Sequence, residues 1–325
     1  MASPRTGQPC PPQPPRQELA EPTGDGDVGR ERPRLRVGIL GPLAVELDGR
    51  PVVIASLRQR ALLVLLAMEA GRAVAVDRLI DRLWDGTPPP QAAVTLRSYV
   101  SNVRQALGGP AGAATALATR GAGYLLELPG EALDAVRLRR LTEQGRELLR
   151  EGRPGEALVA LEEAVGLWRG QPLAEVADHE AARSTVTALT ELYLGAVEAR
   201  FEALLATGRH LAALPDLEAF AADHPLRETP RSLQMLALYR AGRTPEALEV
   251  HRDFRRLLRD ELGLDPSPRL QSLLHDILEQ APALTAPLAT FEPAQAATAT
   301  SDVPVVVTPP VTSVTDIPRP VAAGR

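Results

Sequence analysis

The residues best suited to chemistry in this sequence are arginines, amides and hydroxyls between positions 95 and 105. Residues 91–107 repeat apolar side chains at helical spacing, so we expect a helix with one buried face. That inward stripe is Leu96, Val100, Val103 and Leu107, with Tyr99 at its edge. The outward face has no carboxylate, although surface helices usually mix acids with bases. It carries Arg97, Ser98, Ser101, Asn102, Arg104 and Gln105, and Thr95 lies near its start.

A second polar group lies at a glycine-rich turn. The short apolar runs 117–119 and 124–126 flank Arg120-Gly-Ala-Gly123, which predicts a hairpin with an arginine at its tip. An arginine in such a place is suited to a DNA minor groove, where negative potential concentrates. Arginine and amide side chains on the helix are suited to base edges in the major groove, and hydroxyls to phosphates. The hairpin contributes Thr119, Arg120 and Tyr124.

Several catalytic chemistries are excluded by the residue types present. All 36 basic residues are arginine, so the lysine of a Walker-A loop and the amine of a Schiff base are both missing. A single cysteine, Cys10, excludes an intrachain disulfide and a multi-cysteine metal site. The five histidines are widely spaced, and no nucleophile-elbow or dinucleotide-binding pattern occurs. We therefore expect no cofactor, no metal site and no enzymatic activity.

The front of the chain predicts a small α+β domain over residues 34–128. Alternating apolar residues at 35–39, 43–47 and 51–54 predict three strands, and Asp48-Gly49 marks a hairpin. Helical spacing follows at 57–68, 76–84 and 91–107, before the terminal hairpin. Strands, three helices and a hairpin are the layout of a winged helix, whose third helix enters the major groove. The region carries 11 arginines against 7 acids, a balance of +4.

The back of the chain, residues 134–281, predicts an all-α domain. The motifs GRPGEAL (152–158), GRHLAAL (208–214) and GRTPEAL (242–248) each follow an apolar helix end, and the last two are 34 residues apart. That period is typical of tetratricopeptide helix pairs, in which each glycine ends one helix before the next begins. This region carries 19 arginines against 25 acids, a balance of −6. We expect stacked helical hairpins built to contact macromolecules.

The two ends of the chain differ from the part between them. Residues 1–33 and 282–325 each hold 8 of the 31 prolines, which predicts disordered tails. The longest apolar run, residues 61–68, is far shorter than the roughly 20 residues that span a bilayer. No basic-then-apolar stretch opens the sequence, so secretion is not expected. We expect a cytoplasmic, nucleoid-associated protein with no membrane partner.

Two groups of motifs resemble a known family. VSNVRQAL (100–107) and TRGAGYLL (119–126) resemble the recognition helix and wing of the OmpR/PhoB type of DNA-binding domain. The stretches at 41–52, 58–84 and 95–108 resemble more specifically the SARP family, the Streptomyces antibiotic regulatory proteins. LWRGQPLAEV (167–176) and the stretch 261–278 resemble the bacterial transcriptional activation domain that follows the winged helix in those regulators. Asn102 and Gln105 stand where family members often carry arginine.

The resemblance implies a function and assigns roles to residues. It implies a transcriptional activator that binds direct repeats of double-stranded DNA near promoters of antibiotic gene clusters and helps recruit RNA polymerase holoenzyme. A homodimer on DNA is compatible with such repeats. Arg97, Arg104 and Asn102 would read or flank bases, while Thr95, Tyr99 and Ser101 would anchor phosphates. OmpR-type activators use the loop between the second and third helices to contact polymerase, which here is Asp85, Gly86, Thr87, Pro88, Pro89 and Pro90.

Two other functions remain open from the sequence. The weak +4 balance and the uncharged Asn102 and Gln105 also fit a repeat scaffold whose winged helix binds protein. A regulator gated by a small effector or by phosphorylation of the Thr/Pro-rich tail, Thr285–Thr315, is the other alternative.

Overall fold

The structure is a computed structural model that describes residues 34–109 and 116–285. It begins with an antiparallel sheet of three strands, β1 (Leu35–Gly38), β2 (Ala44–Leu47) and β3 (Arg50–Pro51), in that order. Asp48 and Gly49 both have positive φ, 51° and 76°, as a two-residue hairpin with the right-handed twist of its strands requires. The predicted hairpin is confirmed, although β3 is shorter than the run 51–54.

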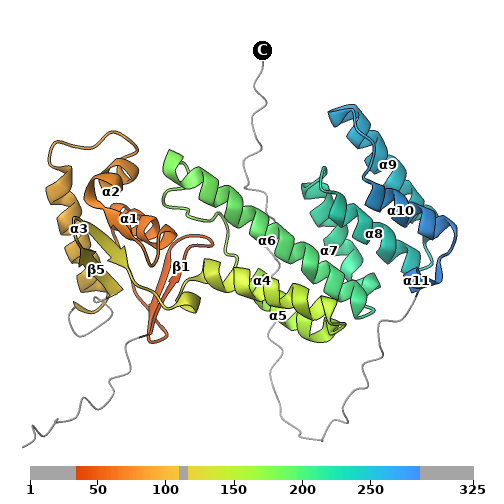
Figure 1. Ribbon diagram of the computed structural model, residues 1–325, viewed down its shortest axis with the longest axis horizontal. Coiled ribbons are helices and arrows are strands. Elements are labelled where there is room, and N and C mark those ends of the chain that lie inside the picture. Colours follow the sequence, from red (N-terminus) through yellow and green to blue (C-terminus); the bar gives the residue numbers. More distant parts are fainter. Residues whose placement is uncertain (1–33, 110–115, 286–325) are drawn as a thin grey trace, which may run out of the picture. The chain divides into compact units, whose positions relative to one another are not determined.

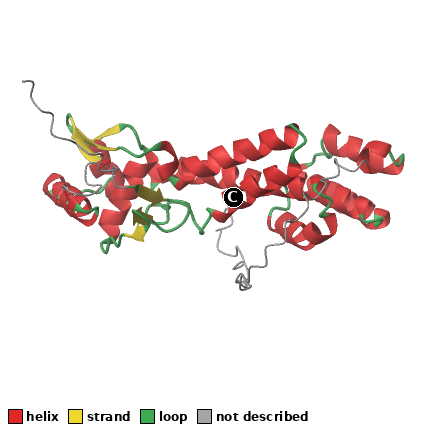
Figure 2. Ribbon diagram, turned by 90° about the horizontal axis from the view of Figure 1, so that it is seen from below, coloured by secondary structure: helices red, strands yellow, loops and turns green. Residues whose placement is uncertain are grey.

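Three helices and a second sheet complete the winged helix (Figures 1 and 2). The predicted helices are present as α1 (Leu57–Met68), α2 (Val76–Leu83) and α3 (Ala92–Ala106). The hairpin strands β5 (Leu117–Arg120) and β6 (Gly123–Leu126) are joined by β4 (Ala73–Ala75), in the order β4-β6-β5. The sequence did not predict β4, because three residues are too few to show a period.

The rest of the described chain is helical. A 3-10 turn, η3 (Gly130–Ala132), leads into α4 (Asp134–Arg150), and neighbouring helices then pack against one another along the chain. None of the described helices combines the length and apolar character needed to cross a bilayer. The remaining helices are α5 (Pro154–Gly166), α6 (Glu180–Ala206), α7 (His210–Asp223), α8 (Glu228–Arg240), α9 (Thr244–Leu262), α10 (Pro268–Leu278) and α11 (Pro282–Thr285).

The three repeated Gly-Arg motifs form the same turn. Gly152, Gly208 and Gly242 all have φ between 73° and 77°, a conformation that glycine adopts without steric cost. In each case the arginine N–H donates to a carbonyl five residues back, as from Arg153 to Leu148, which satisfies a helix-end carbonyl. In all three cases the next helix begins at the residue after that arginine. The prediction that each motif ends one helix and opens another is confirmed.

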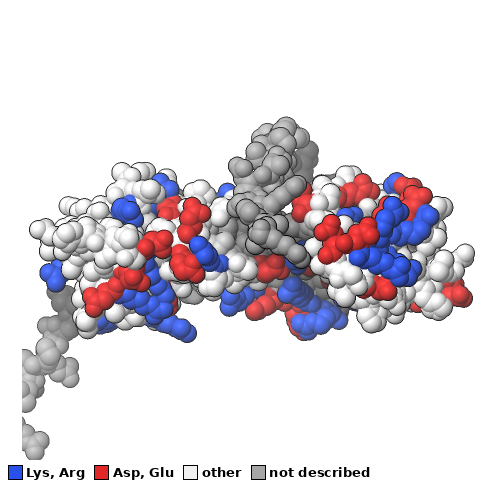
Figure 3. Space-filling view, turned by 90° about the horizontal axis from the view of Figure 1, so that it is seen from above, with Lys and Arg blue, Asp and Glu red and all other residues white. Residues whose placement is uncertain are grey.

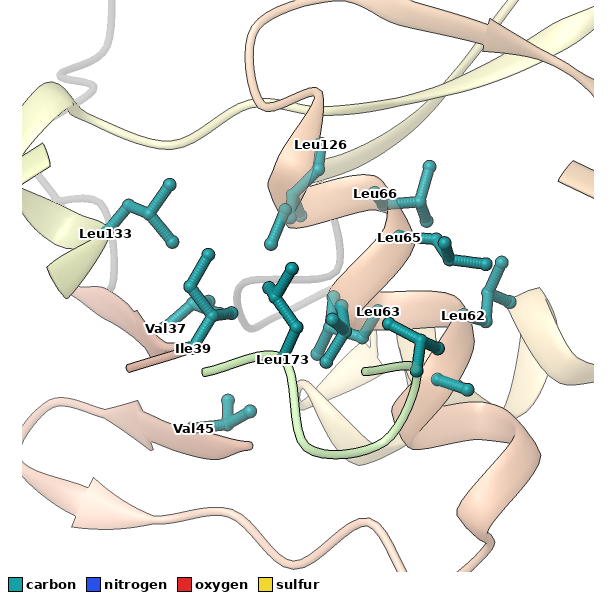
Figure 4. Packing of buried hydrophobic residues seen from close by; sticks show 14 of the residues in the cluster. Val37, Ile39, Val45, Leu62, Leu63, Leu65, Leu66, Leu126, Leu133 and Leu173 are labelled. Atoms are coloured by element: carbon teal, nitrogen blue, oxygen red, sulfur yellow. The ribbon is translucent and has the colours of Figure 1, made fainter. Parts of the chain in front are cut away.

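One hydrophobic core extends from the winged helix into the helical part. It joins residues of β1 and α1 to residues of α4, α5 and α6 and to the connection between α5 and α6. Leu173, in that connection, is 0% exposed and lies among Val37, Ile39, Leu63 and Leu126 (Figure 4). Its N–H donates to the Ile39 carbonyl at 2.8 Å, and its φ of 57° is uncommon for a residue with a Cβ. Tertiary contacts therefore fix this segment against the winged helix.

Two carboxylates complete the junction. Asp134, the first residue of α4, accepts hydrogen bonds from the N–H groups of Ile39 and Leu40 at 2.8 and 3.0 Å. Glu175, whose side chain is 1% exposed, accepts from the Leu43 N–H and from Arg60. Its Oε2 is buried and has no hydrogen-bond partner. These acids belong to the helical part, yet they satisfy backbone and side-chain donors of the winged helix.

The predicted tails fall almost entirely outside the described residues, which exclude 1–33 and 286–325. One correction concerns their boundary. Residues 282–285, placed by the sequence in the C-terminal tail, form α11, and the Leu284 carbonyl accepts a hydrogen bond from Arg240 Nε at 2.9 Å. The proline at the start of α11 needs no N–H partner there, so it opens a helix as readily as it ends one.

Candidate nucleic-acid interface

Helix α3 presents a polar face to solvent. The predicted inward residues Leu96, Val100, Val103 and Leu107 are all buried, which fixes the rotation of the helix. As the outward positions then require, five of the predicted residues are exposed together: Arg97, Ser98, Ser101, Asn102 and Gln105. In the face drawn in Figure 3, the upper part of the left end, where Figure 1 places α2 and α3, is mostly uncharged, and acidic and basic groups lie along its lower edge.

The hydroxyls of this helix are partly occupied by its own backbone. Thr95 Oγ1 donates to the Gln91 carbonyl at 3.1 Å, and Ser98 Oγ donates to the Val94 carbonyl at 3.3 Å. Both keep acceptor lone pairs, but a phosphate oxygen needs a donor, so each hydroxyl must exchange its helix partner to bind one. Ser101 forms no such bond within the described chain, which leaves its hydroxyl free to donate.

The two arginines of α3 have different surroundings. Arg104 donates from Nε to the Leu117 carbonyl at 2.8 Å and from Nη2 to Thr119 Oγ1 at 2.9 Å. Its guanidinium also lies 5.9 Å from the centre of the Tyr124 ring. Arg97 is exposed and has no hydrogen-bond or ion-pair partner among the described residues. Arg104 therefore connects α3 to the hairpin, while Arg97 is available for a ligand.

The aromatic residues predicted for the site are mostly packed. Tyr124 is 8% exposed and belongs to the core beneath the hairpin. Tyr99 is half-buried, and its ring stacks against Trp84 with the centroids 6.3 Å apart. In the helical part, the Trp168 ring likewise stacks on Tyr193, with the ring centroids 4.3 Å apart. The rings of Tyr99 and Tyr124 thus mainly hold α3 and β6 in place.

The wing is a tight hairpin with an exposed cation. Arg120, at the end of β5, is 61% exposed and lies 3.2 Å from Glu127, an exposed pair of the kind that contributes little to stability. Gly121 has a φ of 55°, and a Cβ on Gly123 would lie 2.2 Å from the Val74 carbonyl oxygen. Both glycines are therefore required by the turn and by the close pairing with β4. Thr119 is exposed beside Arg120.

The predicted polymerase-contact loop is exposed throughout, from Asp85 to Pro90. The helical part contacts the base of this loop, which the sequence could not predict. His179 Nδ1 lies 3.0 Å from the Arg82 carbonyl, and the Glu180 N–H donates to Asp85 Oδ1 at 3.3 Å. The start of α6 thereby holds one end of the loop, while Pro88, Pro89 and Pro90 stiffen the other end.

Metal ligands and histidines are the other side chains whose arrangement bears on the kind of site. No three residues of metal-binding type gather in the described part of the chain. The histidines His224 and His251 have pKa values lowered mainly by burial, which is the behaviour of packed side chains. The sequence missed one exposed residue of α3, Val94, because a lone valine outside the apolar stripe carries no periodic signal.

Two family models match the chain. Residues 49–126 match the transcriptional regulatory protein C-terminal family, and residues 133–278 match the bacterial transcriptional activator domain. The first match covers α1–α3 and both wing strands, and the second begins at the residue before α4 and ends with α10.

Known proteins resemble the chain over both parts. The regulatory protein DnrI of Streptomyces peucetius is 37% identical over 256 residues, which are 77% of this chain and 94% of DnrI. The regulatory protein AfsR of Streptomyces coelicolor is 40% identical over 277 residues, 82% of this chain but 27% of AfsR. A solved structure of Mycobacterium tuberculosis EmbR in complex with a low affinity phosphopeptide matches with a TM-score of 0.72 and 36% identity, over 77% of this chain and 66% of that chain.

These similarities confirm the fold class and the family predicted from the sequence. The matched families are regulators of transcription, so the expectation that the chain is not an enzyme also holds. The chain belongs to the SARP family of transcriptional activators, in which an OmpR/PhoB-type winged helix is followed by a bacterial transcriptional activator domain.

Proposed function

We propose that this protein activates transcription by binding direct repeats of double-stranded DNA near promoters of antibiotic biosynthesis genes. The observation that carries the proposal is the outward face of α3, which is exposed, lacks any carboxylate and includes Arg97, which has no partner among the residues that the structure describes. Surface helices that serve only solubility mix both signs of charge. A face of hydroxyls, amides and one cation suits the grooves of DNA, where acceptors and phosphates dominate.

Each part of the face has a proposed role. Helix α3 lies in the major groove, where Asn102 and Gln105 hydrogen-bond to adenine edges. Arg97 contacts a guanine edge or a phosphate beside them, and the hydroxyls of Thr95, Ser98, Ser101 and Tyr99 bind phosphates. Arg120 and Thr119 at the wing contact the neighbouring minor groove and its backbone.

Arg104 and Tyr124 act in a different way from the base-reading residues. Because Arg104 donates to the strand that carries Thr119, it fixes the distance between α3 and the wing. Two elements that enter adjacent grooves must keep a constant separation, so Arg104 is a positioning residue in this proposal. Tyr124 supports the same arrangement from beneath.

The remaining contacts concern partners. The loop Asp85–Pro90 contacts RNA polymerase holoenzyme, and the protein binds each pair of repeats as two copies. We assign residues 34–128 to the DNA-binding domain and 134–281 to the activation domain. We place the protein in the cytoplasm, on the nucleoid.

The proposal is tested with the full chain by in vitro selection from random duplexes, followed by mobility-shift titrations. The wild type is expected to enrich a repeated motif. Arg97→Ala should weaken binding about tenfold or more at physiological salt. Arg139→Ala is the matched control, because Arg139 is an exposed arginine of α4 without a partner in the described chain.

The salt dependence separates the two roles of Arg97. Loss of a phosphate contact would reduce the slope of log affinity against log salt by about 0.9, whereas loss of a base contact would relax the selected motif at one position. Absence of any enriched motif with the wild type would contradict the proposed function.

A further inference from the structure

The outward face of α3 contains one large apolar side chain. Val94 is 57% exposed, and it is the one large apolar side chain of α3 that the structure shows exposed. Single exposed apolar residues are common and need no explanation by themselves. The position of Val94 is what matters, because it lies in the first turn of α3, on the helix that the proposed function places in the major groove.

Val94 lies in line with the polar residues of the proposed interface. Val94, Ser98, Ser101 and Gln105 are spaced i, i+4, i+7 and i+11, so they form one stripe along the helix. Ser98 Oγ donates to the Val94 carbonyl, which holds the neighbouring side chain against the helix backbone. Val94 is thus more exposed than covered, and the other members of its stripe carry hydroxyls and an amide.

The major groove offers one apolar group for such a side chain to contact. The edges of adenine, guanine and cytosine present hydrogen-bond donors and acceptors, whereas thymine also carries a C5-methyl group. We propose that Val94 is a specificity residue that packs against the methyl group of a thymine in each half-site. This inference rests on the proposed function. It names thymine as a base that the protein recognises, which the hydroxyls and the amide of the same stripe do not specify.

The expected loss of DNA affinity follows from the apolar area that one methyl group buries. Without a methyl group that is buried in the complex, the affinity should fall about threefold to tenfold. Valine in a helix also has a lower helix propensity than alanine. Val94→Ala should therefore fold at least as well as the wild type, and a loss of DNA discrimination could not be attributed to unfolding.

The experiment removes the methyl group from the DNA and the isopropyl group from the protein in turn. The duplex selected by the wild type is resynthesised with deoxyuridine at one thymine at a time, and affinities are measured for wild type and Val94→Ala. Val159→Ala is the control, because Val159 is a 68% exposed helical valine of α5. At one thymine per half-site, uracil should weaken the wild type and the control about threefold to tenfold, and leave Val94→Ala unchanged.

Two results would overturn the inference while leaving the proposed function intact. In the first, no thymine is sensitive to uracil. In the second, Val94→Ala keeps the full sensitivity of the wild type. If the wild type selects no duplex at all, the proposed function fails, and the role of Val94 fails with it.

Discussion

Polar groups at the junction between the winged helix and the helical part have hydrogen-bond partners within the chain, whereas several on the outward face of α3 have none among the described residues. At the junction, Asp134 and Glu175 accept several hydrogen bonds each, and Glu175 is almost fully buried. On α3, Arg97 and Ser101 are exposed and form no hydrogen bond within the described chain. Satisfied polar groups fix a geometry, whereas exposed groups without partners are available to a ligand.

This contrast gives the helical part a supporting role in the proposed function. Leu173 and Glu175 lie far from α3 in sequence, yet they fill the core and satisfy the donors on which the winged helix is built. A rigid support places a recognition helix within the narrow tolerance that base contacts require. Mutations at the junction should therefore lower the stability of the protein, whereas mutations on the outward face of α3 should lower its DNA affinity.

The largest expected effect is at the junction core. Leu173→Ala removes a fully buried side chain and should lower the free energy of unfolding by about 3 kcal/mol. Thermal unfolding followed by circular dichroism should show one transition at a lower temperature, because both parts share the core. Leu211→Ala, at a 63% exposed leucine of α7, is the control and should change little. Two separate transitions, with only one of them shifted, would contradict the shared core.

A smaller loss is expected from the buried carboxylate. Glu175→Ala leaves Arg60 and the Leu43 N–H without their acceptor and should cost about 1–3 kcal/mol. Arg60 is partly exposed, so the ion pair itself contributes only part of that loss. Glu175→Gln keeps an acceptor for the N–H and should recover some of the stability in a urea titration. Equal stability of Glu175→Ala and wild type would show that the junction does not depend on this acid.

The two arginines of α3 allow the same comparison of stability and DNA affinity within one helix. Arg104→Ala should lower the free energy of unfolding by about 1 kcal/mol and also weaken DNA binding, because α3 loses its connection to Leu117 and Thr119. Arg97→Ala should weaken DNA binding with no change in the melting temperature. Melting curves and mobility-shift titrations on the same samples distinguish a combined loss of stability and affinity from a loss of affinity alone. A stable Arg104→Ala variant that loses only affinity would make Arg104 a direct contact instead.

The smallest expected effect is on pH dependence. Burial lowers the pKa values of His224 and His251 below their ordinary value, so the unfolded chain takes up protons that the folded chain resists. The free energy of unfolding should fall as the pH drops from 7 through the range in which histidine titrates. Burial raises the pKa of Glu202, which acts in the opposite sense.

The contribution of the two histidines is therefore measured as the difference between the wild type and a variant that lacks both. Urea titrations at pH 7.5 and 5.5 should show a smaller decrease for the double variant His224→Gln, His251→Gln than for wild type. A decrease of equal size in both proteins would mean that these histidines titrate normally in the folded chain.

Much of the site could be predicted from the sequence because its determinants are local. The apolar stripe of α3 fixes which residues face outward, and Gly152, Gly208 and Gly242 mark helix turns through a conformation that other residues avoid. Ser267 caps α10 by accepting a hydrogen bond from the Leu270 N–H, a role for which serine is preferred at helix starts.

The contacts that the sequence did not reveal are those between distant residues. The bond from the Leu43 N–H to Glu175 spans 132 positions, and no period links the two. Arg104 looked equivalent to Arg97 because helical projection shows which side of a helix a residue occupies, but not which strand lies beside it. The identity of that neighbour depends on how the hairpin packs.

The most direct test of the central claim places a negative charge on the outward face of α3. Ser101→Glu introduces a carboxylate where the proposal puts phosphate and base acceptors, while leaving the buried stripe untouched. Ser184→Glu, at an exposed serine of α6, adds the same charge elsewhere. In mobility-shift titrations on the selected duplex, Ser101→Glu should lose detectable specific binding and Ser184→Glu should match the wild type. Wild-type affinity for Ser101→Glu would contradict the assignment of this face to DNA.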